Sequence, residues 1–207
     1  MDITKLTEEI RCLFQKDASG HDFYHTMRVY RNAMTIAKET PCDQEVVALG
    51  ALLHDADDRK LFSTVDYANA RKLLANCGAD PELTEKVISA ISTVSFGGGK
   101  TPESIEGKIL QDADRLDALG AIGIARTFAY GGSHGTPMYD PEIPPRENMT
   151  PEQYRNHKGT SFNHFYEKLL RLKDTMHTKK AKELAAHRHD FLETFAREFL
   201  QEWEGKE

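Results

Sequence analysis

The apolar residues of this chain recur at steps of three and four positions, and this spacing constrains the fold more than any other feature. Such spacing places apolar side chains on one face of an α-helix, whereas a half-buried strand alternates at every second residue. No stretch of the chain alternates β-branched residues in that way. We therefore predict an all-α fold. The stripe of the first segment is Ile3, Leu6, Ile10, Leu13 and Phe14.

Capping and turn residues divide this pattern into helices. Asp43 and Asp66 are good N-cap residues, and Asp80 precedes Pro81, which favours the first turn of a helix. Over residues 131–151, glycines and five prolines interrupt the periodicity and indicate a long loop. Long loops in compact domains are often functional. The expected helices cover about 3–14, 21–38, 44–53, 66–75, 80–96, 104–119, 121–129, 153–176 and 178–203.

Length and composition favour one globular domain. The chain has 207 residues, of which 39% are hydrophobic and 29% charged, and it is long enough for one sizeable core. We predict a single domain over residues 1–207, with its motifs at about 20–140 and a helical C-terminal extension at about 152–204. The formal net charge is −6, so the chain lacks the overall positive charge that is typical of nucleic-acid-binding proteins. We therefore expect no nucleic-acid partner. A small anionic substrate remains compatible, because a few local cations outweigh a mildly acidic surface.

The sequence also argues against a membrane or disulfide-rich protein. No segment approaches the ~18 apolar residues of a membrane span, and the first 16 residues read as an amphipathic helix rather than a signal peptide. The three cysteines are odd in number and form no Cys-x-x-Cys pair. Neither a disulfide framework nor a thiolate zinc site is therefore indicated. We expect a cytoplasmic protein without a membrane partner.

The first chemically informative motif is His54-Asp55, at the end of the apolar run VVALGALL. Imidazole nitrogen and carboxylate oxygen are ligands for Mn, Fe, Co, Ni, Zn or Mg. Alone, the pair is more typical of an ordinary helix ending than of a metal site. Asp58 stands one turn beyond His54 and could orient an imidazole or act as a base, although Asp57 and Asp58 could also be solvated helix-end charges.

Two further segments carry polar side chains in otherwise apolar helices. His21, His25 and Arg28 are spaced at i, i+4 and i+7, so they line one face of a helix. Residues 109–119 contain three carboxylates between apolar positions, and such groups should not be buried without cations to offset them. Spacing alone leaves undecided which of the three would bind an ion. These carboxylates are Asp112, Asp114 and Asp117.

Taken in order, His25, Leu53-His54-Asp55 and Ala113-Asp114-Arg115-Leu116 resemble the H…HD…D signature of the HD-domain superfamily. The wider strings GHDFYHTMRV, ALLHDADD and QDADRLDALGAIG are similar to a bacterial branch of small, single-domain HD phosphohydrolases. The resemblance implies an HD-domain helical bundle. It also implies one divalent metal ion, with Mn²⁺ favoured and Mg²⁺, Co²⁺, Ni²⁺, Fe²⁺ or Zn²⁺ as alternatives. The implied metal ligands are His25, His54, Asp55 and Asp114.

The same resemblance implies a catalytic role for Asp58, which matches an acidic residue that helps many HD enzymes and is a glutamate in some of them. The negative charge of a phosphoester transition state also requires cations and donors. As catalytic candidates we take Arg28 and Arg115. As substrate-binding candidates we take His21, Lys100, Arg126, His134, Lys158 and Lys168.

Some residues near the C-terminal half allow two interpretations. Tyr130, His134 and Tyr139 in the long loop could cover the pocket and stack on a base, or the loop could be structural or a dimer contact. His187 and His189 are expected to be a solvated pair on a helix. A homodimer is compatible with the sequence.

The expected activity is divalent-metal-dependent hydrolysis of a small phosphorylated substrate, most plausibly a nucleotide. Within that class the first expectation is cleavage of a nucleoside triphosphate to monophosphate and pyrophosphate. A 5′-nucleotidase acting on nucleoside monophosphates is the close alternative. From a different class, a non-catalytic nucleotide-binding module is the rival, and an HD oxygenase with a second iron is a weaker one.

Overall fold

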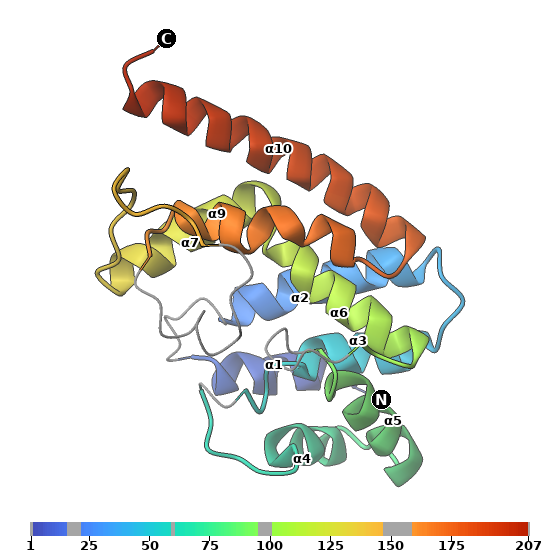
Figure 1. Cartoon of the computed structure of the whole chain (residues 1–207). Coiled ribbons are helices and arrows are strands. Elements are labelled where there is room, and N and C mark those ends of the chain that lie inside the picture. The colour runs from blue at the N-terminus through green and yellow to red at the C-terminus, as the bar shows by residue number, and fades with distance from the viewer. Residues whose placement is uncertain (1, 16–21, 59–60, 95–100, 147–158, 207) are drawn as a thin grey trace. The chain divides into compact units, whose positions relative to one another are not determined.

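The computed structural model describes residues 2–15, 22–58, 61–94, 101–146 and 159–206. Within these ranges every regular element is helical, so the predicted all-α fold is confirmed (Figure 1). None of the described helices is long and apolar enough to span a membrane. The α-helices are α1 (Ile3–Leu13), α2 (Phe23–Ala37), α3 (Gln44–Leu53), α4 (Ala68–Asn76), α5 (Pro81–Ile91), α6 (Ile105–Asp117), α7 (Gly120–Ser133), α9 (Asn163–Glu167) and α10 (Lys179–Trp203).

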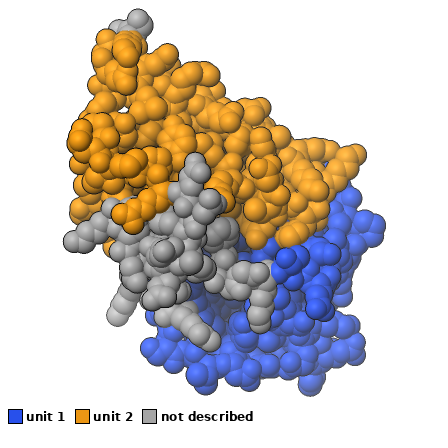
Figure 2. Space-filling view, viewed as in Figure 1, with its two compact units in different colours: residues 1–114 blue, residues 115–207 orange. Residues whose placement is uncertain are grey.

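The chain forms two compact units, residues 1–114 and residues 115–207, which Figure 2 shows in different colours. The single domain expected over residues 1–207 stays a prediction. All three cysteines, Cys12, Cys42 and Cys77, carry free thiols.

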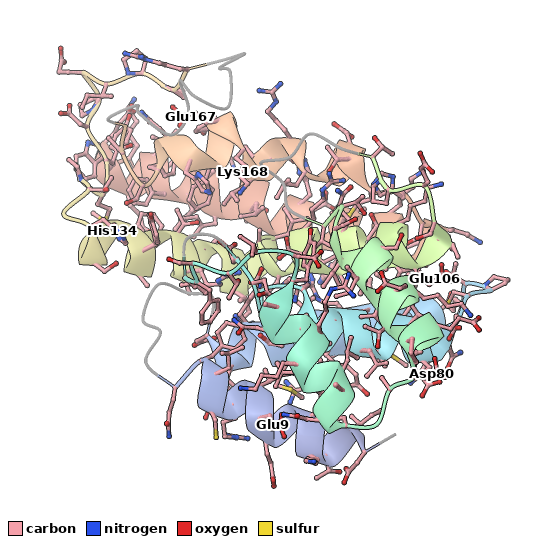
Figure 3. The ribbon with its side chains drawn as sticks, turned by 90° about the horizontal axis from the view of Figure 1, so that it is seen from below. Glu9, Asp80, Glu106, His134, Glu167 and Lys168 are labelled. Atoms are coloured by element: carbon pink, nitrogen blue, oxygen red, sulfur yellow. The ribbon has the colours of Figure 1, made fainter. Side chains whose placement is uncertain are left out.

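The first unit is built around α3, whose residues from Val46 to Leu53 are all buried. This helix packs against α2 and α5 and also contacts α1, which explains why its sequence is apolar on every side. Asp43 caps α3 as predicted and accepts from the backbone N–H groups of Glu45 and Val46. The carboxylate of Glu106, labelled in Figure 3, accepts in turn from the Asp43 backbone at 2.9 Å.

The start of α4 differs from the prediction. The N-cap residue is Tyr67 rather than Asp66, and it makes no side-chain capping hydrogen bond. Both residues adopt the left-handed region, with φ of 52° for Asp66 and 55° for Tyr67. The cap comes instead from Asp57, whose carboxylate accepts from backbone N–H groups in the first turn of α4. Asp57 is therefore not a solvated helix-end charge.

The second unit has an aromatic core between α7, α9 and α10. Phe162 and Phe165 are fully buried, and Phe162 stacks on Phe199 of α10 with ring centroids 4.4 Å apart. The ring centroid of Phe128 in α7 lies 5.9 Å from that of Phe165 and 6.0 Å from that of Phe195. These contacts hold α7 and α10 together, and the two helices pack directly.

The prediction of one helix over residues 153–176 is wrong for residues 159–176, the part that the structure describes. α9 ends at Glu167, and two short 3₁₀ turns, Leu169–Arg171 and Lys173–Thr175, follow it. The backbone leaves helical geometry at Lys168, where φ is −140°. A 3₁₀ turn repeats every three residues and so keeps Leu169 and Leu172 on the buried side, as a helix would. The apolar spacing is therefore compatible with both structures.

Candidate metal centre

His25 and His54 are placed by the ends of two packed helices. His25 is the third residue of α2, and its backbone N–H donates to the N-cap side chain of Asp22 at 2.7 Å. His54 directly follows α3 as its C-cap residue. Asp55 lies in the tight turn that follows, where Ala56 N donates to the Leu53 carbonyl at 3.0 Å. Because α2 packs on α3, the two imidazoles meet.

The side chains of these residues converge with Asp114 of α6. The Nε2 atoms of His25 and His54 are 3.3 Å apart, and Asp55 Oδ2 lies 3.4 Å from the former and 3.3 Å from the latter. Asp114 Oδ1 is 3.5 Å from His25 Nε2. The ligand atoms of His25, His54 and Asp114 all lie within 4.8 Å of one another, an arrangement that could hold a metal ion.

This donor set fits a divalent cation. Ligand atoms ~2.1 Å from one tetrahedral ion lie about 3.4 Å apart, close to the observed separations. In its neutral form His54 donates from Nδ1 to the Ala51 carbonyl at 2.9 Å, and Nε2 then offers its lone pair to an ion in the cluster. The side chains of His25 and His54 are each 1% exposed, so the imidazoles are shielded from water.

The electrostatics of the cluster also favour a cation. Burial lowers the pKa of His54, but the negative charges of Asp55 and Asp114 outweigh it, and the pKa is raised to about 9. Two carboxylates placed beside buried imidazoles thus create a site that attracts positive charge. HD domains bind divalent metals, and the cluster supplies nitrogen and oxygen ligands of the kind that such ions take.

Comparison with known proteins agrees with this geometry. The HD domain family model matches residues 22–119, which include all four clustered side chains. Bacillus subtilis YpgQ is 38% identical over 97% of this chain and 95% of its own length. The chain belongs to the HD-domain superfamily.

Solved structures extend the likeness of this HD chain to the whole fold. A Lactobacillus plantarum protein has a TM-score of 0.86 at 38% identity, covering 98% of this chain and 97% of its own. A Bacillus thuringiensis protein described as an HD-superfamily hydrolase has a TM-score of 0.76 at 42% identity, covering 98% and 96%. YpgQ in complex with ADP has a TM-score of 0.77 at 35% identity, covering 97% and 100%. The Bacillus thuringiensis neighbour, together with the HD family match, supports hydrolase activity.

The three carboxylates that spacing could not separate have different surroundings in this HD chain. Asp114 joins the histidines. Asp117 is 2% exposed and pairs with Arg126 at 2.7 Å. Asp112 is fully buried. Asn32 Nδ2 of α2 donates to the Ala113 carbonyl at 3.2 Å and so ties α2 to the backbone beside Asp114.

The sequence analysis did not identify Asp22 and Asn32 as residues that position the candidate site of this HD chain. Asp22 carried a usable signal, because an aspartate three residues before His25 is a typical N-cap spacing. Asn32 gave none, because its partner is 81 residues away along the chain.

In the first unit, Arg28 and Asp58 have positions compatible with their predicted roles. Arg28 follows His25 by three residues on α2, so both lie on one face of that helix. Asp58 closes the turn after Asp55, and its backbone N–H donates to the Asp55 carbonyl at 3.1 Å. The candidates His21, Lys100 and Lys158 lie outside the described residues.

The other predicted cations belong to the second unit. Arg115 Nη1 donates to the Thr175 carbonyl at 2.6 Å, and Arg126 pairs with Asp117. His134 is exposed and stacks on Tyr130 with ring centroids 3.9 Å apart. Lys168 sits at the end of α9, and both His134 and Lys168 are labelled in Figure 3. Their roles in substrate binding stay predictions.

Tyr139 and His189 of the second unit pack against neighbouring side chains. The ring centroid of Tyr139 lies 5.2 Å from that of Phe162 and 5.0 Å from that of Trp203, so the Tyr139 ring packs against the aromatic core. His187 is exposed, but His189 is 6% exposed and its Nε2 lies 3.0 Å from Glu193 Oε1. The expected solvated pair is thus wrong for His189, because residues two positions apart on α10 point to nearly opposite faces of the helix.

Proposed function

We propose that this HD-superfamily protein is a divalent-metal-dependent phosphohydrolase that acts on nucleotides. The observation that carries the proposal is the convergence of His25, His54, Asp55 and Asp114, which we take as the ligands of one ion. Mn²⁺ is the favoured ion by resemblance to the small bacterial HD phosphohydrolases, and a set of two imidazoles and two carboxylates is compatible with it. The preferred reaction is hydrolysis of a nucleoside triphosphate to the monophosphate and pyrophosphate.

A nucleotide substrate is supported by a relative and by charge. The related YpgQ was crystallised in complex with ADP. Two carboxylates neutralise a divalent ion, so a triphosphate needs further cations from the protein. Arg28 lies on the His25 face of α2 and is our first candidate for that role, with Arg115 second.

A divalent ion at this site would lower the pKa of a bound water and polarise a phosphoryl oxygen. The four clustered residues hold and orient the ion, and the His54 bond to Ala51 fixes the orientation of that imidazole. We assign Asp58 to position the attacking water and to accept its proton. The water oxygen bonds to the α-phosphorus, the bond from that phosphorus to the bridging oxygen breaks, and pyrophosphate leaves.

The test combines metal analysis with separate product assays. Wild-type protein with Mn²⁺ is incubated with a panel of deoxynucleoside triphosphates and nucleoside monophosphates, and pyrophosphate and phosphate are measured separately. His54→Ala and Asp55→Ala should lose both bound metal and turnover. His187→Ala is the matched control, because this histidine is exposed on α10 and should leave both unchanged.

Each outcome has a distinct meaning. Pyrophosphate released from a triphosphate supports the preferred reaction. Phosphate released from a monophosphate indicates a 5′-nucleotidase, and tight nucleotide binding without either product indicates a non-catalytic module. Full activity after the metal has been stripped by a chelator contradicts the proposal as a whole.

A further inference from the structure

Asp57 follows Asp55 by two residues, and its carboxylate binds the first turn of α4. Oδ1 accepts from the backbone N–H of Asn69 at 3.0 Å, and Oδ2 accepts from that of Ala70 at 2.9 Å. In the opposite direction, Asn69 Nδ2 donates to the Ala56 carbonyl at 2.8 Å. We call Ala56, Asp57, Asn69 and Ala70 the clamp, because these three hydrogen bonds join two segments of the first unit.

The clamp replaces a cap that α4 does not provide for itself. The first N–H groups of a helix have no partner within that helix. Tyr67, the N-cap residue, makes no side-chain bond to them, and the backbone at Asp66 and Tyr67 lies in the left-handed region that non-glycine residues seldom adopt. Asp57 supplies both acceptors from 12 residues away, and its negative charge is favourable at the start of a helix.

The other side of the clamp lies next to the candidate metal ligands. Ala56 and Asp57 directly follow Asp55, so their hydrogen bonds to α4 restrain the turn that carries His54 and Asp55. α4 packs against α1 and α5, and α5 packs against α3, so the clamp ties both ends of this turn to one helical framework. Because both carboxylate oxygens of Asp57 accept bonds from α4, Asp57 is suited to hold the turn rather than to bind an ion.

We infer that Asp57 is a positioning residue, which aims His54 and Asp55 at the metal through the clamp. This inference rests on the metal site of the proposed function. Side chains that orient metal ligands typically change metal affinity about 10- to 100-fold when they are replaced. The role of Asp57 is therefore measurable in metal binding itself, without any assay of turnover.

Two isosteric variants test the two halves of the clamp. Asp57→Asn replaces one acceptor oxygen with an amide group that faces a backbone N–H, and Asn69→Asp places a carboxylate oxygen against the Ala56 carbonyl. In each variant we expect the Kd for Mn²⁺ to rise about 10-fold, with one ion still bound at saturation. The absorption spectrum of the Co²⁺-loaded protein should shift as well, because the ligands reorient.

Asp80→Asn is the matched control. Asp80, labelled in Figure 3, is exposed and caps α5 in the same unit, where Oδ1 accepts from the Leu83 N–H at 2.8 Å. The chemical change is the same as in Asp57→Asn, but no clamp is involved. This variant should bind Mn²⁺ and Co²⁺ as the wild type does.

Wild-type Mn²⁺ affinity and an unchanged Co²⁺ spectrum in both clamp variants would overturn the positioning role alone. A folded Asp57→Asn protein that binds no ion at all would overturn it too, because Asp57 would then be a ligand. If Asp57→Asn does not fold, as judged by circular dichroism, the same measurements on Asn69→Asp decide the question. A wild-type chain that binds no Mn²⁺ would overturn the proposed function and this inference together.

Discussion

Replacing Arg126 with methionine tests whether this cation serves the fold of the second unit or a substrate. Arg126 Nη1 lies 2.7 Å from Asp117 Oδ2, and the two side chains are 28% and 2% exposed. Methionine keeps an apolar stem of similar length but removes the guanidinium. The carboxylate of Asp117 then stays buried without this guanidinium, although the charge of Arg188 still acts on it.

The expected loss follows from the geometry of this pair. Two unit charges ~4 Å apart interact by about 4 kcal/mol at an effective dielectric constant near 20. Removing one partner of a buried pair typically costs about 3–5 kcal/mol. Because Arg126 is partly exposed and Arg188 also acts on Asp117, we expect no more than the lower end, a loss of about 3 kcal/mol in the free energy of unfolding of the second unit.

Urea denaturation followed by tryptophan fluorescence measures this loss selectively. Trp203 is the single tryptophan of the chain and lies at the end of α10, so its emission reports on the second unit. Lys180→Met is the control within the same unit, because the Lys180–Glu183 pair spans 3.7 Å and Glu183 is 51% exposed. Its expected cost is below about 0.5 kcal/mol.

A double variant completes the cycle. Asp117→Asn removes the buried charge, so adding it to Arg126→Met should recover more than half of the lost stability. The reasoning is refuted if Arg126→Met costs less than about 1 kcal/mol, or if the double variant is as unstable as the single one. Either result would return Arg126 to the set of phosphate-binding candidates.

Two further predictions concern stability. In Gly50→Ala, the new Cβ would lie 2.5 Å from Cδ1 of Leu110, which is fully buried. We expect a net loss of about 1–2 kcal/mol in the free energy of unfolding, although alanine has the better helix propensity. Urea denaturation followed by circular dichroism measures this loss. Burial, aided by the charge of Lys168, lowers the pKa of His164 from 6.5 to about 3. The stabilisation from neutral His164 is therefore present above pH 6.5 and is lost as the pH falls, by at most ~1.4 kcal/mol per pH unit, and His164→Gln should flatten this dependence between about pH 7 and 5. An unchanged pH slope in that variant would contradict the assignment.

The sequence predicts the helices well where the interactions that define them are local. Asp43 and Asp80 cap α3 and α5 from adjacent positions, and both helices begin where the pattern places them. Asp66 fails as a cap because Asp57, 12 residues from Asn69, takes that role. A remote cap depends on tertiary structure, and no local pattern indicates it.

The candidate metal centre was predictable only in part for the same reason. The order of His25, His54-Asp55 and Asp114 resembles a known signature, and the four side chains do converge. Periodicity alone could not separate Asp114 from Asp117, because both lie in α6 among apolar residues. Asp117 differs from Asp114 in its partner, because Arg126, nine residues further along the chain, pairs with Asp117.

The cations of the substrate site are harder to predict than the metal ligands, because a phosphate accepts almost any arginine or lysine that reaches it. A metal ion needs particular ligand types within a few ångströms of one another, and this restricts the choice to few residues. The chain has 27 lysines and arginines, and many have structural partners, as Arg71 has in Glu85 and Arg126 in Asp117. Arg28 is the strongest candidate on this reasoning, because a rigid helix fixes it one turn from His25, on the face that carries this candidate metal ligand.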